Sequence, residues 1–370
     1  MARSASFFIW SLLISVCWSF FSAFTNATPE LFNSRQFTPG SQFPVGIYDR
    51  IDKPEHLTEI KKMGFDLVMP YTNPYARGNF QTIQTYLDRA NSLGIRVILE
   101  PNRQVIKTQN LPAIIRFVRN FVRHPALYGW YSYDEPVFNQ ISPRLLEQVY
   151  RLIKREDRHR PIILDFSGPR SRKAIRYSSG FDIGMINQYP LKHGVPIETA
   201  FKTFRSEVKS FSRLNRNDFW LVLQSFRGDQ KWRLPKLKEQ KYMLYSGLAK
   251  GATGIFFYAY HRAPLAWQQK VVVPLVRELK TYLPAISKGQ VPGVKSDRRE
   301  VETLLYPDNN GYLLVAINHQ NKTVASQIEL AQEFNFSQVL SAQTKQAFQM
   351  THHMMRDTFA PYEVRFYRVD

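Results

Sequence analysis

Cysteine is nearly absent from this sequence. The single cysteine, Cys17, lies inside an apolar stretch, Phe7–Phe24, that follows the basic residue Arg3. A basic residue, an apolar segment and then Thr-Asn-Ala at 25–27 are typical of a secretory signal peptide cleaved after Ala27. A mature chain beginning at residue 28 would contain no cysteine, which excludes disulfide bonds and thiol catalysis.

This N-terminal pattern predicts a chain exported from a bacterial cell, either periplasmic or secreted. The apolar stretch is long for a signal peptide, so an uncleaved single-pass anchor is the alternative. Four serines weaken the anchor interpretation: Ser11, Ser15, Ser19 and Ser22. We therefore expect membrane contact only through this segment, and only if it stays uncleaved.

Acidic residues are also scarce relative to basic ones. There are 30 Asp and Glu against 50 Lys and Arg, giving a formal net charge of +20. Such a charge favours acidic partners, for example anionic glycans or envelope surfaces. Nucleic acid is not expected, because the chain is exported and carries no nucleic-acid-binding motif. A solvated basic surface without a dedicated partner is the plainer explanation.

The common signatures of metal, cofactor and acyl chemistry are missing as well. No His, Cys and Asp residues have metal-ligand spacing, since His352 and His353 are adjacent and isolated. Ser132 and Ser225 lack the glycines of a nucleophile elbow. No glycine-rich phosphate loop follows the first expected strand. We therefore expect no metal and no cofactor.

What the sequence does contain is a regular alternation of short apolar strands with helix-period segments, after a leader at 28–42. The expected strands are 43–48, 65–71, 95–100, 127–135, 161–165, 181–189, 219–226 and 254–260. Eight strand–helix pairs in roughly 250 residues is the count of a (β/α)₈ TIM barrel, predicted here for residues 43–288. The strands are almost continuously apolar, as parallel strands buried on both faces must be.

A change of composition at 289–299 predicts a linker. Beyond it, residues 300–370 are expected to form a small C-terminal antiparallel β-sandwich. Its strands are predicted at 301–306, 311–318, 324–330 and 362–369, with a hairpin turn at 308–311.

The fourth strand ends in two adjacent acids and a proline, Asp134, Glu135 and Pro136. Chemistry in a parallel barrel sits at the C-terminal ends of the strands. The residues expected at those ends, besides the two acids, are Asp49 or Arg50, Tyr71, Glu100, Asp165, Asn187, Tyr189, Gln224, Tyr258 and His261. Acids and amides can bind hydroxyl groups and aromatic rings can stack on sugars, so this set suits a polyhydroxylated ligand.

These residues resemble a known family. The acids follow His-Pro-Ala-Leu-Tyr-Gly-Trp at 124–130, and this region resembles the clan A glycoside hydrolases, whose general acid is a Glu ending the fourth strand in an Asn-Glu-Pro motif. The segment Gly247–Tyr258 is similar to the eighth-strand region of those enzymes, and the resemblance spans about residues 43–286. It implies a barrel, a carbohydrate substrate and Glu135 as general acid/base, with Asp134 in place of the family's Asn.

The resemblance has a gap at the seventh strand, where the family's nucleophilic Glu is replaced by Gln224. An amide can neither form a glycosyl ester nor act as a base. Three candidates remain for a second carboxylate: Glu100, Asp165 and Asp134. Glu135 is expected to have a raised pKa, from an apolar surround such as Trp130 and from the charge of Asp134.

Three interpretations stay open: a glycoside hydrolase with catalytic Glu135 and Asp134, a barrel that binds glycan without cleaving it, and an envelope structural protein. The expected substrate-binding residues are Trp130, Glu100, Asp165, Asn187, Tyr189, Gln224, Tyr258 and His261. Each also has a structural alternative. Glu100 and Asp165 could pair with Arg50 or Arg103, Gln224 and Asn187 could cap the core, and His261 could be an ordinary loop residue.

Overall fold

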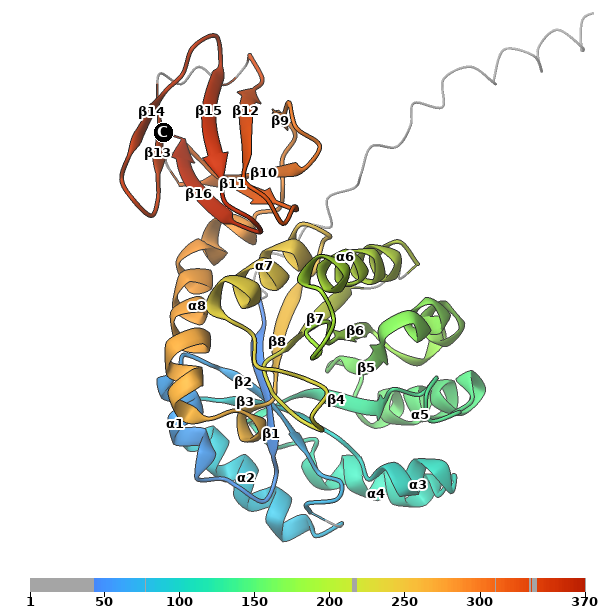
Figure 1. The fold of residues 1–370 in the computed structure, drawn as a ribbon. Coiled ribbons are helices and arrows are strands. Elements are labelled where there is room, and N and C mark those ends of the chain that lie inside the picture. The colour runs from blue at the N-terminus through green and yellow to red at the C-terminus, as the bar shows by residue number, and fades with distance from the viewer. Residues whose placement is uncertain are drawn as a thin grey trace, which may run out of the picture. The chain divides into compact units, whose positions relative to one another are not determined.

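The computed structural model describes residues 43–76, 78–214, 218–309, 311–332, 334 and 338–369. The expected signal peptide at 1–27 and leader at 28–42 lie outside these residues. Figure 1 shows strands in the middle of the larger part, helices around them, and the last strands in orange and red. Within the described ranges, no helix has the length and apolar character needed to cross a membrane.

The larger part is a closed barrel of eight parallel strands in sequential order, with β1 pairing β8. The strands are β1 (Val45–Arg50), β2 (Leu67–Tyr71), β3 (Arg96–Leu99), β4 (Leu127–Asp134), β5 (Ile162–Ser167), β6 (Ile183–Gln188), β7 (Asp218–Gln224) and β8 (Gly254–Tyr258). All eight overlap the strands expected from the apolar runs, so the predicted TIM barrel is confirmed.

Helices follow the strands as the alternating pattern predicts, with one exception. They are α1 (His56–Lys62), α2 (Phe80–Ser92), α3 (Arg103–Lys107), α4 (Leu111–Phe121), α5 (Pro143–Glu156), α6 (Ile197–Leu214), α7 (Leu237–Leu248) and α8 (Leu265–Ile286). After β5 the chain instead forms 3₁₀ turns, η1 (Gly168–Gly180), and a short 3₁₀ turn, η2 (Tyr260–Arg262), precedes α8.

The barrel interior is filled by large side chains that alternate along each strand with side chains facing the helices. Trp220 and Phe256 stack inside with ring centroids 5.3 Å apart. They fit because the neighbouring strand positions are glycines. A Cβ at Gly254 would lie 2.5 Å from Trp220, and one at Gly46 would collide with Phe256. Paired large and small residues thus make the barrel interior a packed core that has no room for a ligand.

The C-terminal part is two antiparallel sheets that enclose their own apolar core. One sheet has the order β10 (Val301–Asp308), β11 (Gly311–Asn318), β16 (Val364–Val369), β13 (Gln338–Ser341) and β14 (Ala347–Gln349). The other has the order β15 (Met354–Phe359), β12 (Val324–Leu330) and β9 (Val294–Ser296). The predicted β-sandwich is confirmed, including the β10–β11 hairpin, in which Asp308 pairs Gly311. Four of its short strands, β9, β13, β14 and β15, were not predicted.

The barrel and the sandwich belong to one compact unit and share buried contacts. The ring of Tyr282 on α8 stacks on Phe366 of β16 at 4.3 Å. Lys250, which follows α7, donates a hydrogen bond to Glu302 of β10 at 2.5 Å. Glu302 in turn bonds His319 at 2.8 Å, and His319 bonds Tyr242 of α7 at 3.0 Å. The sandwich is therefore fixed to the barrel by apolar packing and by a buried polar chain.

Candidate active site at the C-terminal mouth of the barrel

The two acids that end β4 sit in a sharp, well-fixed turn. Asp134 closes the strand, and Glu135 has a positive φ of 47°, an uncommon conformation for a non-glycine residue. The Glu135 N–H donates to the carbonyl of Asp165 on β5, and Asn139 donates to the carbonyls of Asp134 and Glu135. Backbone residues held in this region cluster at functional sites because the surrounding structure must enforce them.

Both carboxylate oxygens of Asp134 have a partner. The hydroxyl of Tyr131, from the same strand, donates to one oxygen at 2.7 Å. The guanidinium of Arg103 lies 3.0 Å from the other. The side chain of Asp134 remains 18% exposed, so a ligand at the mouth can still reach it.

Glu100, at the end of β3, lies beneath Arg103 and is completely buried. Arg103 donates to it at 2.5 Å, and Thr72 donates to its carboxylate at 3.5 Å. Burial raises the pKa of Glu100 to about 7, although Arg103 acts in the opposite direction. The expectation that Glu100 binds substrate is therefore wrong. It is a buried partner of Arg103, and through Arg103 it positions Asp134.

Glu135 is partly buried and faces Asn187 and Asp165. Asn187 of β6 donates to Glu135 at 2.9 Å and also to Asp165. Burial raises the pKa of Glu135, and the nearby charge of Asp134 raises it further, while the bond from Asn187 acts against them. Asp165 is 1% exposed, and one of its oxygens has no partner among the described residues. Burial, with the charges of Asp134 and Glu135 nearby, raises the pKa of Asp165 well above its usual range.

Aromatic side chains line the rest of the mouth. Tyr189 at the end of β6 stacks on Tyr258 at the end of β8, with centroids 5.5 Å apart, and contacts Phe226 at 5.0 Å. Tyr258 also lies 6.1 Å from Tyr71, whose ring is covered by the Arg103 guanidinium at 5.2 Å. Tyr71, Tyr189 and Tyr258 are each partly exposed. The structure thus brings the predicted Tyr189 and Tyr258 to the same mouth as Asp134.

Trp130 does not reach this mouth, and the expectation that it binds substrate and shields Glu135 is wrong. Its side chain is fully buried on the helix-facing side of β4, where it packs on Phe117. Its indole N–H donates to Asp157 at the end of α5 at 2.9 Å. Tyr131, the next residue, points inward instead, because neighbouring strand residues face opposite sides.

Gln224 lies at the end of β7 as expected, but it is not available to a ligand. It accepts a hydrogen bond from the N–H of Leu191 at 2.8 Å. Its amide donates to the carbonyls of Leu191 and Arg233 at 3.0 and 2.9 Å. The side chain is completely buried. The expectation that Gln224 binds substrate is wrong, and the alternative, that it caps the core, describes what it does.

His261 lies in η2, next to Tyr75 and partly exposed. Burial, with the charges of Arg50 and Arg262 nearby, lowers the pKa of His261 to about 4, so the imidazole is neutral at neutral pH. It cannot supply a positive charge to a ligand. The structure therefore places His261 at the edge of the mouth as an uncharged donor or acceptor.

Sequence reasoning missed two residues that shape the site. Tyr131 bonds Asp134, and Arg103 joins Asp134 to Glu100. The signal for Tyr131 was present, since it lies three residues before Asp134 on an expected strand. Arg103 was expected only as a salt-bridge partner, because no strand ends at it.

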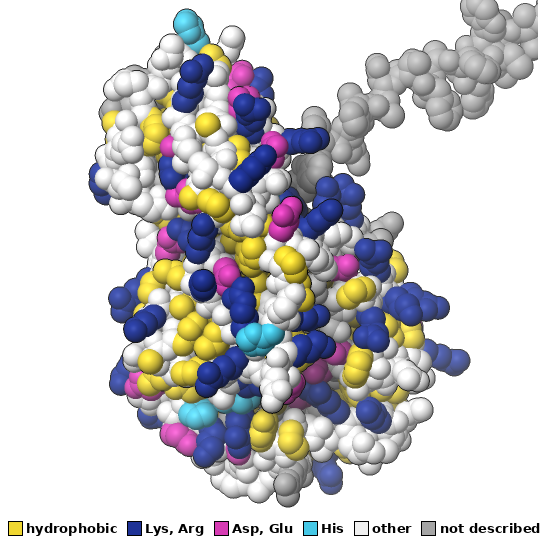
Figure 2. Space-filling model, viewed as in Figure 1, with side chains coloured by type: hydrophobic (Ala, Val, Ile, Leu, Met, Phe, Trp, Pro, Cys, Tyr) yellow, Lys and Arg dark blue, Asp and Glu magenta, His cyan; other side chains and the backbone are white. Residues whose placement is uncertain are grey.

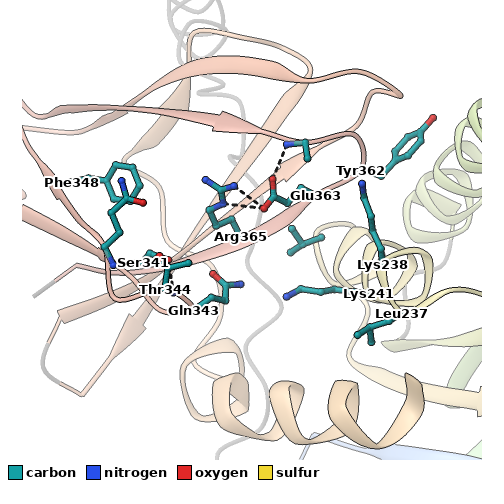
Figure 3. A pocket seen from close by; sticks show the side chains of 13 residues that line it. Leu237, Lys238, Lys241, Ser341, Gln343, Thr344, Phe348, Tyr362, Glu363 and Arg365 are labelled. Atoms are coloured by element: carbon teal, nitrogen blue, oxygen red, sulfur yellow. Dashed lines mark hydrogen bonds and ion pairs between the residues drawn. The ribbon is translucent and has the colours of Figure 1, made fainter. Parts of the chain in front are cut away.

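Two cavities lie away from Glu135. The larger, about 510 Å³, lies between α7 and the sandwich (Figure 3). Its lining includes Lys238, Lys241, Phe348 and Arg365. The smaller, about 100 Å³, lies between Phe80 of α2 and Phe117 of α4. Within the described ranges, no three His, Cys, Asp or Glu side chains gather so as to hold a metal ion.

The fold and the mouth together define a (β/α)₈-barrel protein with carboxylates and aromatic rings at the C-terminal ends of its strands, the architecture that the resemblance to clan A glycoside hydrolases implies. No protein-family model matches the sequence, and no curated protein matches it.

Solved structures do share the fold. A β-L-arabinopyranosidase from Geobacillus stearothermophilus, in complex with arabinose, superposes with a TM-score of 0.61 at 10% identity, over 90% of this chain and 97% of that chain. A maltogenic α-amylase from Thermotoga neapolitana gives 0.60 at 10% identity, over 89% and 99%. An endoxylanase from Clostridium papyrosolvens gives 0.50 at 11% identity, over 89% and 97%. All three are glycoside hydrolases, and at these identities the likeness shows a shared fold.

Proposed function

We propose that this protein is an exported glycoside hydrolase acting on an oligo- or polysaccharide, with Glu135 as general acid/base and Asp134 as the second carboxylate. The observation that carries the proposal is the contrast between two neighbouring acids at one barrel mouth. Glu135 is partly buried and its pKa is raised by burial, while Asp134 pairs with Arg103 and accepts a hydrogen bond from Tyr131. Two acids in unlike surroundings are what glycosidic bond cleavage requires.

The proposed chemistry gives the two acids different roles. Protonated Glu135 donates its proton to the glycosidic oxygen, the bond from that oxygen to the anomeric carbon breaks, and the leaving sugar departs as an alcohol. Asp134 stabilises the positive charge that develops at the anomeric carbon. A water molecule then adds to that carbon and returns a proton to Glu135, which restores the starting state.

Of the three candidates for the second carboxylate, Asp134 is the one that suits this role. Glu100 is completely buried beneath Arg103. Asp165 is buried, and burial raises its pKa. Asp134 pairs with Arg103 and is partly exposed. The wall formed by Tyr71, Tyr189 and Tyr258 offers apolar ring faces on which sugar rings can stack.

A second candidate function, glycan binding without cleavage, is favoured by one observation. At the end of β7, where the resembling family has its nucleophile, Gln224 is sealed by three backbone hydrogen bonds. A barrel that had lost its chemistry would keep the aromatic wall and bind sugar all the same. The two functions differ in whether new reducing ends appear.

A glycan panel decides between them. We expect the purified protein to release reducing ends from at least one oligo- or polysaccharide, and the Glu135→Gln variant to bind that glycan without cleaving it. As a matched control, Glu147→Gln changes an acid on α5 that pairs with Arg151 of the same helix, and it should keep full activity. Binding without any cleavage by the unmodified protein would establish the second function instead, and full activity of Glu135→Gln would remove Glu135 from the mechanism.

A further inference from the structure

The arginine that ends η2, Arg262, lies at the edge of the mouth, and among the described residues it has no acidic partner closer than 4.0 Å. Its guanidinium covers the ring of Phe226 at 5.0 Å and that of Tyr258 at 6.0 Å. Tyr258 belongs to the aromatic wall that leads through Tyr71 to Arg103 and Asp134. A sugar stacked on this wall would therefore bring its substituents close to Arg262.

Two other arginines near the mouth, Arg50 and Arg103, are already paired with acids. Arg50 is bound by both oxygens of Asp52, at 3.0 and 2.7 Å. Arg103 lies between Glu100 and Asp134. Arg262 differs, because the carboxylate paired with it, that of Asp229, is 4.0 Å away and 71% exposed. The Arg262 side chain is itself 33% exposed, so a ligand can reach its N–H groups.

The loop after β7 is shaped to leave room for this guanidinium. A Cβ on Gly228 would lie 2.6 Å from a terminal nitrogen of Arg262, closer than real Cβ contacts. Hydrogen bonds between the backbones of Gly228 and Trp232 close the loop around this position. Arg262 is thus stacked on two rings and confined by a glycine, which pre-organises its planar donors for a carboxylate or sulfate.

We propose that Arg262 is a specificity-determining residue that binds an anionic substituent, a uronate carboxylate or a sulfate ester, on a glycan lying along the Tyr71–Tyr258 wall. This inference rests on the proposed function, since it names the substrate class of the same mouth. The net charge of +20 does not indicate which basic residue would bind an anion, and this inference names one. Lys and Arg are scattered over the face seen in Figure 2, so local geometry distinguishes Arg262 where bulk charge does not.

Binding measurements test the inference without requiring turnover. The probes are galacturonate oligosaccharides, glucuronate-containing oligosaccharides and sulfated oligosaccharides, each beside its carboxyl-reduced or desulfated form, titrated into Glu135→Gln protein. We expect at least one acidic probe to bind better than its neutral form, and better at low salt than at high salt. The uronate and sulfate arms distinguish the two sources of negative charge.

Adding Arg262→Gln should weaken binding of the preferred acidic probe by about tenfold or more and leave its neutral form within about twofold. Arg262→Lys should fall in between, because it keeps the charge and loses the planar fork. Gly228→Ala should reduce the same preference, because its Cβ would push the end of the Arg262 side chain out of position. The matched control is Arg96→Gln, which removes an arginine from over Tyr128 at the start of β3, the other end of the barrel.

Three results overturn the inference: no acidic probe binds better than its neutral form, Arg262→Gln weakens both forms equally, or Arg96→Gln has the same effect as Arg262→Gln. These outcomes are separate from failure of the proposed function. Cleavage of neutral glycans with no acidic preference would leave the hydrolase and remove this specificity. Acid-selective binding that depends on Arg262, without any cleavage, would keep the specificity and remove the hydrolase.

Discussion

At the scale of single residues, the site depends on how each acid is partnered. Asp134 has a cation and a hydroxyl donor, Asp165 has one amide donor and an unpartnered oxygen, and Glu135 lies between these extremes. Burial raises the pKa of Asp165 and of Glu135, and the charge of Asp134 adds to both effects. Three neighbouring carboxylic acids therefore have three different sets of hydrogen-bond and charge partners.

Asn187 tunes the proton affinity of Glu135. Its N–H donates to the Glu135 carboxylate and favours the ionised form. In Asn187→Ala the pKa of Glu135 should rise, so the protonated acid should persist to higher pH. We expect the alkaline limb of the kcat/KM profile to move up by about half a pH unit or more. Asn79→Ala, which removes only the cap of α2, should leave the limb in place. A limb that moves downward would contradict this account of Glu135.

Asp165 should cost the fold stability at neutral pH. The pKa of Asp165 in the folded protein lies above the ordinary value of 3.8. The contribution of this residue to stability is therefore most favourable below pH 3.8 and is lost as pH rises through the folded pKa. The stability of Asp165→Asn lacks this pH dependence. Its free energy of unfolding should exceed that of the parent protein by about 1 kcal/mol at pH 7 and by little near pH 3. Thermal unfolding across pH measures the difference. A variant that is less stable than the parent at pH 7 would show that the carboxylate is needed for folding.

The sequence locates at the mouth those residues whose position follows from strand period alone. Asp134, Tyr189 and Tyr258 reach the mouth because they end expected strands. Trp130 and Gln224 occupy expected strand positions too, yet their side chains are committed elsewhere. Trp130 falls on the outer face of β4, and Gln224 bonds to loop backbone that only the folded chain brings near. Periodicity locates a residue but does not reveal its hydrogen-bond partners.

At the scale of elements, Gln224 ties two loops of the mouth together. Its amide bonds Leu191, after β6, and Arg233, after β7. Gln224→Glu would restore the acid that the resembling family has, but it would place an acceptor against two carbonyl oxygens. We expect this variant to lose about 2–4 kcal/mol of stability at neutral pH and to gain no activity. Thermal unfolding measures the loss of stability and an activity assay measures turnover. Gln240→Glu, the same substitution at another buried glutamine, is the comparison. Increased turnover would show that a carboxylate at this position can act as a nucleophile.

Helices and strands could be predicted where apolar residues recur at a regular spacing. They could not be predicted where the sequence has no such spacing. All eight barrel strands are apolar runs, and α5 shows a helical stripe after Ser142 caps it. The segment after β5 contains Pro169 and many polar residues, so it forms the 3₁₀ turns of η1 where the alternating pattern requires a helix. The sandwich strands β13, β14 and β15 are short and mixed in polarity, which leaves little periodic signal.

At the scale of the whole molecule, a buried polar chain fixes the sandwich to the barrel. Burial alone would raise the pKa of Glu302, but the hydrogen bond from His319 and the charge of Lys250 outweigh it and lower the pKa to about 2. This contribution to stability is present above the usual glutamate pKa of 4.5 and is lost as pH falls toward 2.

Glu302→Gln should therefore destabilise the protein by about 2 kcal/mol at pH 7, and by progressively less as pH falls below 4.5. The matched control is Glu329→Gln, which removes an exposed pair with Lys295 at 3.1 Å and should cost less than about 0.5 kcal/mol. Chemical denaturation at several pH values measures both variants. Equal effects from the two substitutions would mean that the buried chain does not hold the two parts together.

The central claim is that Glu135 delivers a proton to a departing sugar oxygen, and its most direct test varies the leaving group. On the sugar that the protein cleaves, a series of aryl glycosides with leaving phenols of increasing pKa is hydrolysed by the unmodified protein and by Glu135→Gln. Loss of a general acid predicts a deficit of about 1000-fold on the poorest leaving groups and a much smaller one on the most activated. A deficit of the same size across the whole series would contradict the claim.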